Sequence, residues 1–280
     1  MRIERFGSFS ALGLLMLVAG TATALAADGL AHNWQLGMPE PASNVARGVD
    51  VFHTYLVWLV TLISLFVLAL LVVCVVRYNE NANPVPSRTT HNTMLEVAWT
   101  IVPVLILVAI AVPSFRLLRE QLVIPQHDIV VKATGYSWYW GYEYPADQGG
   151  FRFESNMVPE GELKPGQPRL LAVDNEMVVP VGKVVKLQVT AGDVLHAFGV
   201  PHFGIMIDAV PGRLNETWFR PERTGVYYGQ CRELCGNGHP YMPIAVRVVT
   251  EQEYAAWLEQ AKTRFARIDG AGEVRVAESR

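Results

Sequence analysis

Five side chains with soft or intermediate metal-binding atoms gather in two short stretches of the sequence. Cys231, Cys235, His239 and Met242 lie within twelve residues, and His196 precedes Cys231 by thirty-five positions. Thiolate, imidazole and thioether groups suit copper or zinc rather than calcium or magnesium. Zinc sites built from two Cys and two His usually have more closely spaced cysteines, and they give a methionine no role. The set therefore favours copper.

The second cysteine decides which copper chemistry fits. A one-copper electron-transfer site uses two His, one Cys and a weak Met, so Cys231 and Cys235 together are one thiol too many. Two thiolates can bridge two copper ions and let one electron spread over both metals, which keeps rearrangement small and transfer fast. The alternatives are a disulfide between the cysteines and, for His196, a core histidine. The spacing to His239 and Met242 favours the metal site.

Elements that would position these ligands follow Pro125, where short β-branched runs alternate with Gly, Pro and Asp clusters. Such runs, with no long helical period between them, predict an antiparallel sandwich or barrel. A tail with apolar residues spaced among charges, 251–268, predicts one amphipathic surface helix. The runs are 129–131, 170–173, 184–189 and 244–249.

The first half of the chain carries two long apolar segments. They predict membrane-spanning helices over about 51–76 and 95–118, joined by a short polar loop that contains Asn83-Pro84. Residues 1–26, with two early arginines, an apolar run and a final Ala-Leu-Ala, predict a cleaved signal peptide; the alternative is a further membrane anchor. With the signal removed, two crossings return the remainder to the outside and leave the loop in the cytoplasm.

Composition agrees with one globular domain plus membrane segments. The 280 residues are 51% hydrophobic with a net charge of -3, so no broad basic surface is available for nucleic acid. Three cysteines cannot form a disulfide framework for a domain of this size.

The metal loop resembles a known family. Its pattern Cys-x-Glu-x-Cys-x-x-x-His-x-x-Met is similar to the dinuclear copper A motif of cytochrome c oxidase subunit II, of the bacterial aa3 type. The resemblance extends over nearly the whole mature chain. Its other segments are Gly135-Tyr-Ser-Trp-Tyr-Trp-Gly-Tyr-Glu-Tyr, Leu170-Leu-Ala-Val-Asp-Asn, Val194-Leu-His, Asp208-Ala-Val-Pro-Gly-Arg-Leu-Asn and Tyr227-Tyr-Gly-Gln-Cys.

This resemblance implies a two-helix transmembrane hairpin followed by a cupredoxin-like Greek-key β-sandwich. The parts are a signal peptide (1–26), the hairpin segment (27–125), the copper A domain (126–250) and a C-terminal helix and tail (251–280). It implies that the two thiolates bridge two coppers, with two imidazoles, a thioether and the Glu233 carbonyl completing the site. The ligand set is His196, Cys231, Glu233, Cys235, His239 and Met242.

Three further roles follow from the resemblance. Trp138 matches the tryptophan at which an electron from cytochrome c enters, and the alternative is a packing aromatic in a strand. Glu96 matches an acidic residue near the entrance of a proton path, and the alternative is a carboxylate favoured by the dipole of its helix. The Glu233 carboxylate matches a magnesium ligand at the boundary with subunit I. Met206 stands where the family commonly has lysine, which puts a proton-exit role there in doubt.

The implied function is subunit II of a haem-copper oxidase in the bacterial inner membrane, with its copper domain in the periplasm. It would accept electrons from cytochrome c and pass them to haem in subunit I, where oxygen is reduced and protons are pumped, with subunit III as a further partner. Acidic residues predict a docking face for basic cytochrome c: Glu143, Asp147, Asp174 and Asp193. The competing functions are a structural subunit of a quinol oxidase and a membrane-anchored copper carrier. A nitrous oxide reductase, with a similar copper loop, would need a larger chain.

Overall fold

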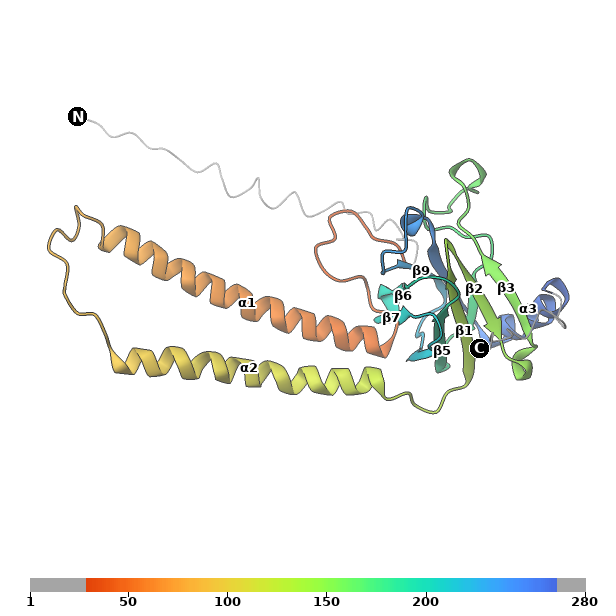
Figure 1. Cartoon of the computed structure of the whole chain (residues 1–280), viewed down its shortest axis with the longest axis horizontal. Coiled ribbons are helices and arrows are strands. Elements are labelled where there is room, and N and C mark those ends of the chain that lie inside the picture. The colour runs from red at the N-terminus through yellow and green to blue at the C-terminus, as the bar shows by residue number, and fades with distance from the viewer. Residues whose placement is uncertain (1–28, 266–280) are drawn as a thin grey trace, which may run out of the picture.

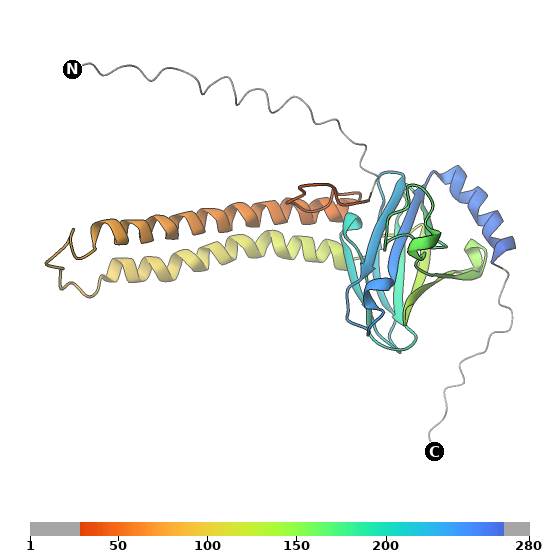
Figure 2. The same ribbon diagram turned by 90° about the horizontal axis from the view of Figure 1, so that it is seen from above.

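A pair of long helices extends from one side of a β-sandwich (Figure 1, Figure 2). This computed structural model describes residues 29–265. The predicted signal peptide and the tail beyond Phe265 lie outside the described residues.

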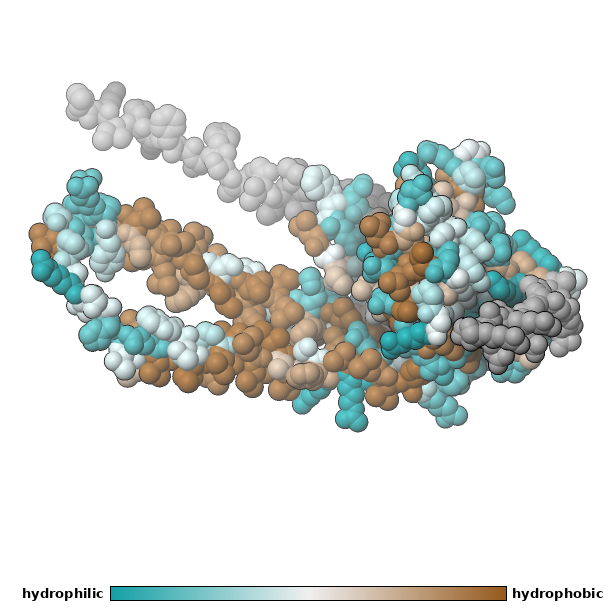
Figure 3. All heavy atoms as spheres, viewed as in Figure 1, coloured by the Kyte–Doolittle hydropathy of each residue, from teal (hydrophilic) through white to brown (hydrophobic). Residues whose placement is uncertain are grey.

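The two helices lie side by side and run in opposite directions. They are α1 (Asn44–Arg77) and α2 (Thr93–Leu122), and both are long and apolar enough to cross a membrane. Figure 3 shows apolar residues along both helices and polar residues at the connecting loop. A helix satisfies its backbone hydrogen bonds internally, so it can lie in lipid without water. The apolar side chains on the outside of both helices therefore suit a bilayer.

Both helices continue past the apolar runs that predicted them, because their ends are held by side chains. Ser43 caps α1: its Oγ accepts a hydrogen bond from Ala46 N at 3.0 Å and donates one to Phe203 O at 2.8 Å. Near the end of α2, Trp218 Nε1 donates to Glu120 O at 3.1 Å. Hydropathy marks the part of a helix inside hydrocarbon, whereas these contacts extend each helix to the surface of the sandwich.

Two five-stranded sheets form the sandwich. The first has the order β3-β2-β1-β5-β8 and the second β4-β10-β9-β6-β7. Their strands are β1 (Ile129–Tyr136), β2 (Tyr139–Tyr144), β3 (Phe151–Ser155), β4 (Met177–Pro180), β5 (Val185–Ala191), β6 (His196–Val200), β7 (Ile205–Ala209), β8 (Asn215–Phe219), β9 (Gly225–Cys231) and β10 (Pro243–Val249).

The prediction of a purely antiparallel arrangement is wrong in detail. β1 pairs with β5 in parallel, and β10 pairs with β4 in parallel, so each sheet is mixed. The apolar run 170–173 also does not form a strand: it is a turn after Pro168, with Leu170 at φ 65° and one bridge from Val173 to Met157. The hydrophobicity of this run indicates that its side chains pack against the domain, but it does not show that the backbone pairs as a strand.

Aromatic side chains fill the space between the sheets and the C-terminal helix. Trp140, Tyr142 and Tyr144 alternate along β2 and are fully buried. The helix α3 (Glu251–Arg264) begins with a capping box between Thr250 and Glu253 and packs its buried face on this aromatic layer. It confirms the amphipathic helix predicted there, as far as residue 264.

Two buried tyrosines make a matched pair for a stability prediction. Tyr144 Oη donates to Val178 O at 2.8 Å and accepts from Val178 N at 3.0 Å, whereas Tyr142 Oη has no hydrogen-bond partner among the described residues. Tyr144→Phe leaves two buried backbone groups unpaired, so we expect a loss of about 1–3 kcal/mol in the free energy of unfolding. Tyr142→Phe should be neutral or stabilising. Denaturant unfolding of the detergent-solubilised chain, followed by near-UV circular dichroism, checks both; equal effects would contradict the prediction.

Candidate metal centre

Sheet pairing brings the distant histidine to the cysteine loop. His196 begins β6 and Cys231 ends β9, and these strands are neighbours in the sheet with Phe198 opposite Cys231. The chain then turns through residues 232–242, which include a short helical turn, His239–Tyr241, before β10 begins. The loop therefore folds back beside the start of β6.

Six potential ligand atoms converge at this end of the sandwich. Cys231 Sγ lies 4.0 Å from Cys235 Sγ, 3.9 Å from His196 Nδ1 and 3.3 Å from Glu233 O. Cys235 Sγ lies 3.6 Å from His239 Nδ1 and 3.5 Å from Met242 Sδ. One compact group within it is His196, Cys231 and Cys235, whose ligand atoms all lie within 4.8 Å of one another.

These spacings fit metal coordination. Ligands bound at about 2.0–2.3 Å to one tetrahedral ion lie roughly 3.3–3.8 Å from each other, which is the range seen around Cys235. The two thiols are about twice as far apart as disulfide-bonded sulfurs. The donors are two thiols, two imidazoles, one thioether and one carbonyl, which is a set suited to copper.

The two cysteine thiols differ in acidity. Burial raises the pKa of the Cys231 thiol, but the contact with the His196 imidazole and a hydrogen bond from the backbone of Ala197 outweigh this effect and lower the pKa below the ordinary cysteine range. Burial and the nearby charge of Cys231 raise the pKa of Cys235. Both thiols would lose their protons on binding a metal, so metal binding at this pair depends on pH.

His196 is fully buried and hydrogen-bonded on both sides of its ring. Its Nε2 lies 2.9 Å from Asp193 Oδ1. An ionised carboxylate only accepts hydrogen bonds, so Nε2–H donates and Nδ1 keeps its lone pair toward Cys231. Burial lowers the pKa of His196, but the contacts with Cys231 and Asp193 raise it overall. Gly135 makes room for the ring, because a Cβ there would lie 2.9 Å from His196 Cδ2.

Trp138 lies against the metal loop. It occupies the turn between β1 and β2, its side chain is partly exposed, and its Nε1 donates to Cys235 O at 3.1 Å. Gly236 and Gly238 face its ring so closely that a Cβ at Gly238 would overlap the ring atoms. The indole thus joins the surface of the protein to the backbone of a candidate ligand.

Gly238→Ala tests this contact. Gly238 has φ -87°, which alanine adopts without strain, so the only cost is the clash with the Trp138 ring. We expect the indole to be displaced, which shifts its fluorescence. Gly161→Ala is the control, since nothing lies within 4 Å of a Cβ there. Unchanged fluorescence in Gly238→Ala would contradict the contact.

The remaining predicted residues lie apart from the cluster or at its edge. The Glu233 carboxylate is exposed. Glu96 lies in the first turn of α2, the position at which the helix dipole favours a carboxylate, and its Oε1 accepts from Asn92 N at 3.3 Å. Met206 projects from β7 and is 70% exposed.

Two residues next to the ligands were not singled out in the sequence. Trp140 Nε1 donates to Met242 O at 3.3 Å and its ring meets His196 edge-on, at 6.2 Å between centroids. Gly135 begins the aromatic segment that carries the family resemblance, and only the fold shows why a glycine is needed there.

The predicted acidic face is less free than the sequence indicates. Glu143 pairs with Lys132 at 3.2 Å, Asp174 accepts from Asn156 N at 2.8 Å, and Asp193 contacts His196. Only Asp147 of the four has no such polar contact recorded in the described structure. Three of these four carboxylates therefore have contacts within the domain itself.

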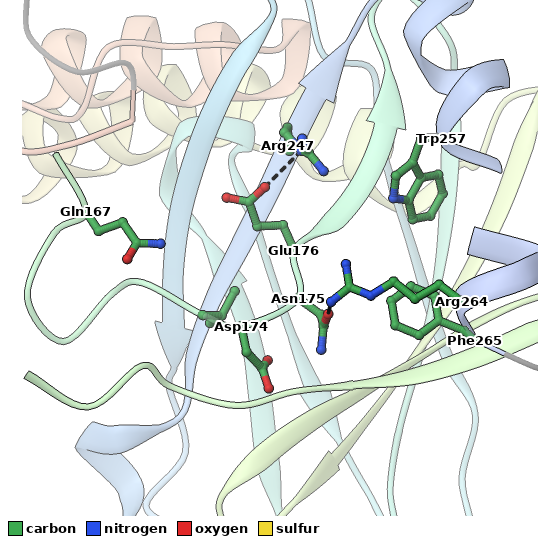
Figure 4. Close-up of a pocket in the computed structure, with 9 residues that line it drawn as sticks. Gln167, Asp174, Asn175, Glu176, Arg247, Trp257, Arg264 and Phe265 are labelled. Carbon is green, nitrogen blue, oxygen red and sulfur yellow. Dashed lines mark hydrogen bonds and ion pairs between the residues drawn. The ribbon is translucent and has the colours of Figure 1, made fainter. Parts of the chain in front are cut away.

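A separate pocket lies between the sandwich and α3 (Figure 4). Arg247 Nε pairs with Glu176 Oε2 at 2.9 Å across it, and Arg264 donates to Asn175 Oδ1 at 2.9 Å. None of its lining residues is a candidate copper ligand, and none has a thiol, imidazole or thioether group. It is not the candidate metal site.

Comparisons with known proteins cover most of the chain. The family model described as cytochrome c oxidase subunit II, periplasmic domain, matches residues 129–249, and the model of its transmembrane domain matches residues 31–117. A probable cytochrome c oxidase subunit 2 of Rickettsia bellii is 48% identical over 225 residues, covering 80% of this chain and 83% of that protein. Cytochrome c oxidase subunit 2 of Cereibacter sphaeroides is 46% identical over 276 residues, covering 90% of each chain.

One solved structure similar to this chain is a crystal structure of the periplasmic domain of cytochrome oxidase subunit II from Bradyrhizobium japonicum. It is 58% identical and covers 51% of this chain and all of that one, with a TM-score of 0.48.

Proposed function

Because the chain belongs to the cytochrome c oxidase subunit II family, we propose that it accepts electrons from cytochrome c at a two-copper centre and passes them to haem in subunit I. It is a two-pass membrane protein and a subunit of an oxidoreductase. In the complete oxidase this transfer feeds the reduction of oxygen to water and proton pumping.

The convergence of six donor atoms carries the proposal. One four-coordinate ion has no use for six donors, so the number of donors fits a centre of two copper ions. His196, Cys231, Cys235, His239, Met242 and the Glu233 carbonyl would hold it. Bound copper supplies reversible one-electron chemistry.

The protein's own residues prepare the site. Both thiols, the His196 imidazole and Met242 are buried, so water is kept from these donors. The pairing of β6 with β9 fixes the positions of His196 and Cys231. Ligands that are already in place need little movement when the charge of the centre changes. Low rearrangement favours fast transfer in both directions.

Trp138 is proposed as the point of electron entry. Its indole is 37% exposed on one side and hydrogen-bonded to the Cys235 carbonyl on the other. An electron donor docked over this ring would be separated from the centre by one indole, one hydrogen bond and the covalent bonds of Cys235.

The docking of a basic cytochrome c is expected to depend on salt. The range of electrostatic interaction falls from about 30 Å at 0.01 M to about 8 Å at 0.15 M ionic strength. We therefore expect the kcat/KM for cytochrome c to decrease across this range, while reduction by a small neutral reductant stays constant. A kcat/KM that barely changes with salt would contradict an electrostatic docking face.

Three further assignments belong to the same proposal. The exposed Glu233 carboxylate would bind magnesium at the boundary with subunit I, and Glu96 would lie near the entrance of a proton path. Subunit III is a further partner. The copper domain would lie in the periplasm after cleavage of residues 1–26, leaving the loop between α1 and α2 in the cytoplasm.

Copper analysis with electron paramagnetic resonance on the purified full-length chain tests the central claim. Two coppers per chain and one unpaired electron shared equally between both nuclei are the expected result. One copper without a delocalised signal would favour a carrier of copper. Absence of copper, with Cys231 and Cys235 joined in a disulfide in fresh membranes, would leave a structural subunit of a quinol oxidase as the better function.

A further inference from the structure

Asp193 links the two functional parts of the site. Its Oδ1 accepts a hydrogen bond from His196 Nε2 at 2.9 Å and another from Val194 N at 2.7 Å. Its Oδ2 accepts from Ser137 N at 2.7 Å. Ser137 directly precedes Trp138. One carboxylate therefore contacts a candidate copper ligand and the backbone that carries the proposed electron-entry residue.

The second imidazole has no equivalent support. His239 is only partly buried, its Nδ1 faces Cys235 Sγ, and no hydrogen bond or ion pair joins it to a carboxylate in residues 29–265. A carboxylate that accepts from the distal nitrogen fixes both the tautomer and the orientation of a ligand imidazole, and it makes the ligand nitrogen more basic. The two histidines therefore differ in their support, because a carboxylate holds the ring of His196 and none holds the ring of His239 in the described residues.

We propose that Asp193 is a positioning residue that holds His196 in the Nε2–H tautomer and holds the Trp138 turn against the metal loop. This inference rests on the proposed function. It assigns Asp193 a role inside the electron-transfer unit, in place of a docking charge alone.

Geometry explains why a carboxylate is needed. Asp193 accepts three hydrogen bonds, and its two oxygens serve donors on opposite sides. Asparagine has one oxygen, so an amide NH2 would face either the Ser137 N–H or the His196 ring. Asp193→Asn therefore breaks one of the two links while keeping the size of the side chain.

Glu154→Gln is the matched control. Asp193 and Glu154 both raise the pKa of Tyr139 by their charge, so both act on the same part of the surface. In the described structure the Glu154 carboxylate makes no hydrogen bond or ion pair. This change removes an equal charge without touching a ligand.

The first measurement uses the metal-free, full-length chain in detergent with ¹⁵N-labelled histidine, the His196 signals being identified with His196→Gln. We expect wild type and Glu154→Gln to hold His196 as the Nε2–H tautomer and Asp193→Asn to show mixed tautomers. A neutral wild-type His196 that carries its proton on Nδ1 would overturn the proposal, whatever the variants do.

The second measurement uses the copper-loaded chain. Without the carboxylate, the more oxidised state loses stabilisation, so Asp193→Asn should have a higher reduction potential and altered hyperfine structure. Copper retention against a chelator should fall about 10- to 100-fold, as for other partners of ligand histidines. If Asp193→Asn matches Glu154→Gln in tautomer, potential and retention, Asp193 is only a surface charge and the proposal fails. A wild-type chain that binds no copper would defeat the proposed function, while the metal-free measurement would still decide the role of Asp193.

Discussion

Cys231→Ser is expected to abolish the two-copper centre and to lower cytochrome c oxidation by the assembled oxidase more than about 100-fold. Loss of a group that merely orients a ligand costs about 10- to 100-fold in metal affinity, and loss of a shared thiolate should cost more. Serine is isosteric but stays protonated at neutral pH, so it cannot replace the charge that two ions would share. The measurement is copper per chain, together with turnover at saturating cytochrome c.

Cys74→Ser is the matched control for this substitution. Cys74 lies near the far end of α1 and is exposed there, away from the sandwich. It should leave copper content and turnover unchanged. Retention of two coppers and full turnover in Cys231→Ser would show that the converging donors are not the redox site, provided that near-UV circular dichroism shows the same fold in all three chains.

Trp138→Phe is expected to slow reduction by cytochrome c about tenfold or more, equivalent to roughly 1.4 kcal/mol in the barrier, without loss of copper. Phenylalanine keeps an aromatic ring in the turn but removes the N–H that donates to the Cys235 carbonyl. The link from the surface to the ligand backbone is then broken, while the donor atoms stay in place. Stopped-flow reduction by cytochrome c, compared with reduction by a small neutral reductant, separates entry from later transfer.

Trp257→Phe controls for the general effect of losing an indole. Trp257 lies on α3 and packs against Tyr144 and Phe151, away from the candidate ligands. It should leave the rate of reduction by cytochrome c unchanged. Equal rates in wild type and Trp138→Phe would place electron entry elsewhere on the domain.

Much of the architecture follows from local patterns in the sequence. The two apolar runs predicted the spanning helices, because hydrocarbon selects for length and hydropathy, both local properties. The strand at 244–249 was also predicted from its β-branched run, and the helix beginning at Glu251 from apolar residues spaced among charges. The run 170–173 was mistaken for a strand, because an apolar segment that forms a turn can have the same composition as a short strand.

Local sequence patterns could not predict which strands pair with each other. The parallel pairs β1–β5 and β4–β10 join segments far apart in the chain, and no property of either segment alone selects its neighbour. Two contacts at the ends of the helices also lie beyond local patterns. Ser43, which caps α1, donates to Phe203 O, and Trp218 donates to Glu120 O near the end of α2; both bonds exist only when the sandwich is packed on the hairpin.

The sequence by itself determined the ligand chemistry of this protein, since the types of donor and the spacing from Cys231 to Met242 already favour copper. Only the tertiary structure decided how His196 joins them, because its position depends on the pairing of β6 with β9. The same holds for the contacts of Asp193 with both His196 and Ser137 and for the glycines that admit the Trp138 ring. Identity and spacing are properties of the chain, whereas the direction in which a ligand points is set by register, packing and hydrogen bonds between distant segments.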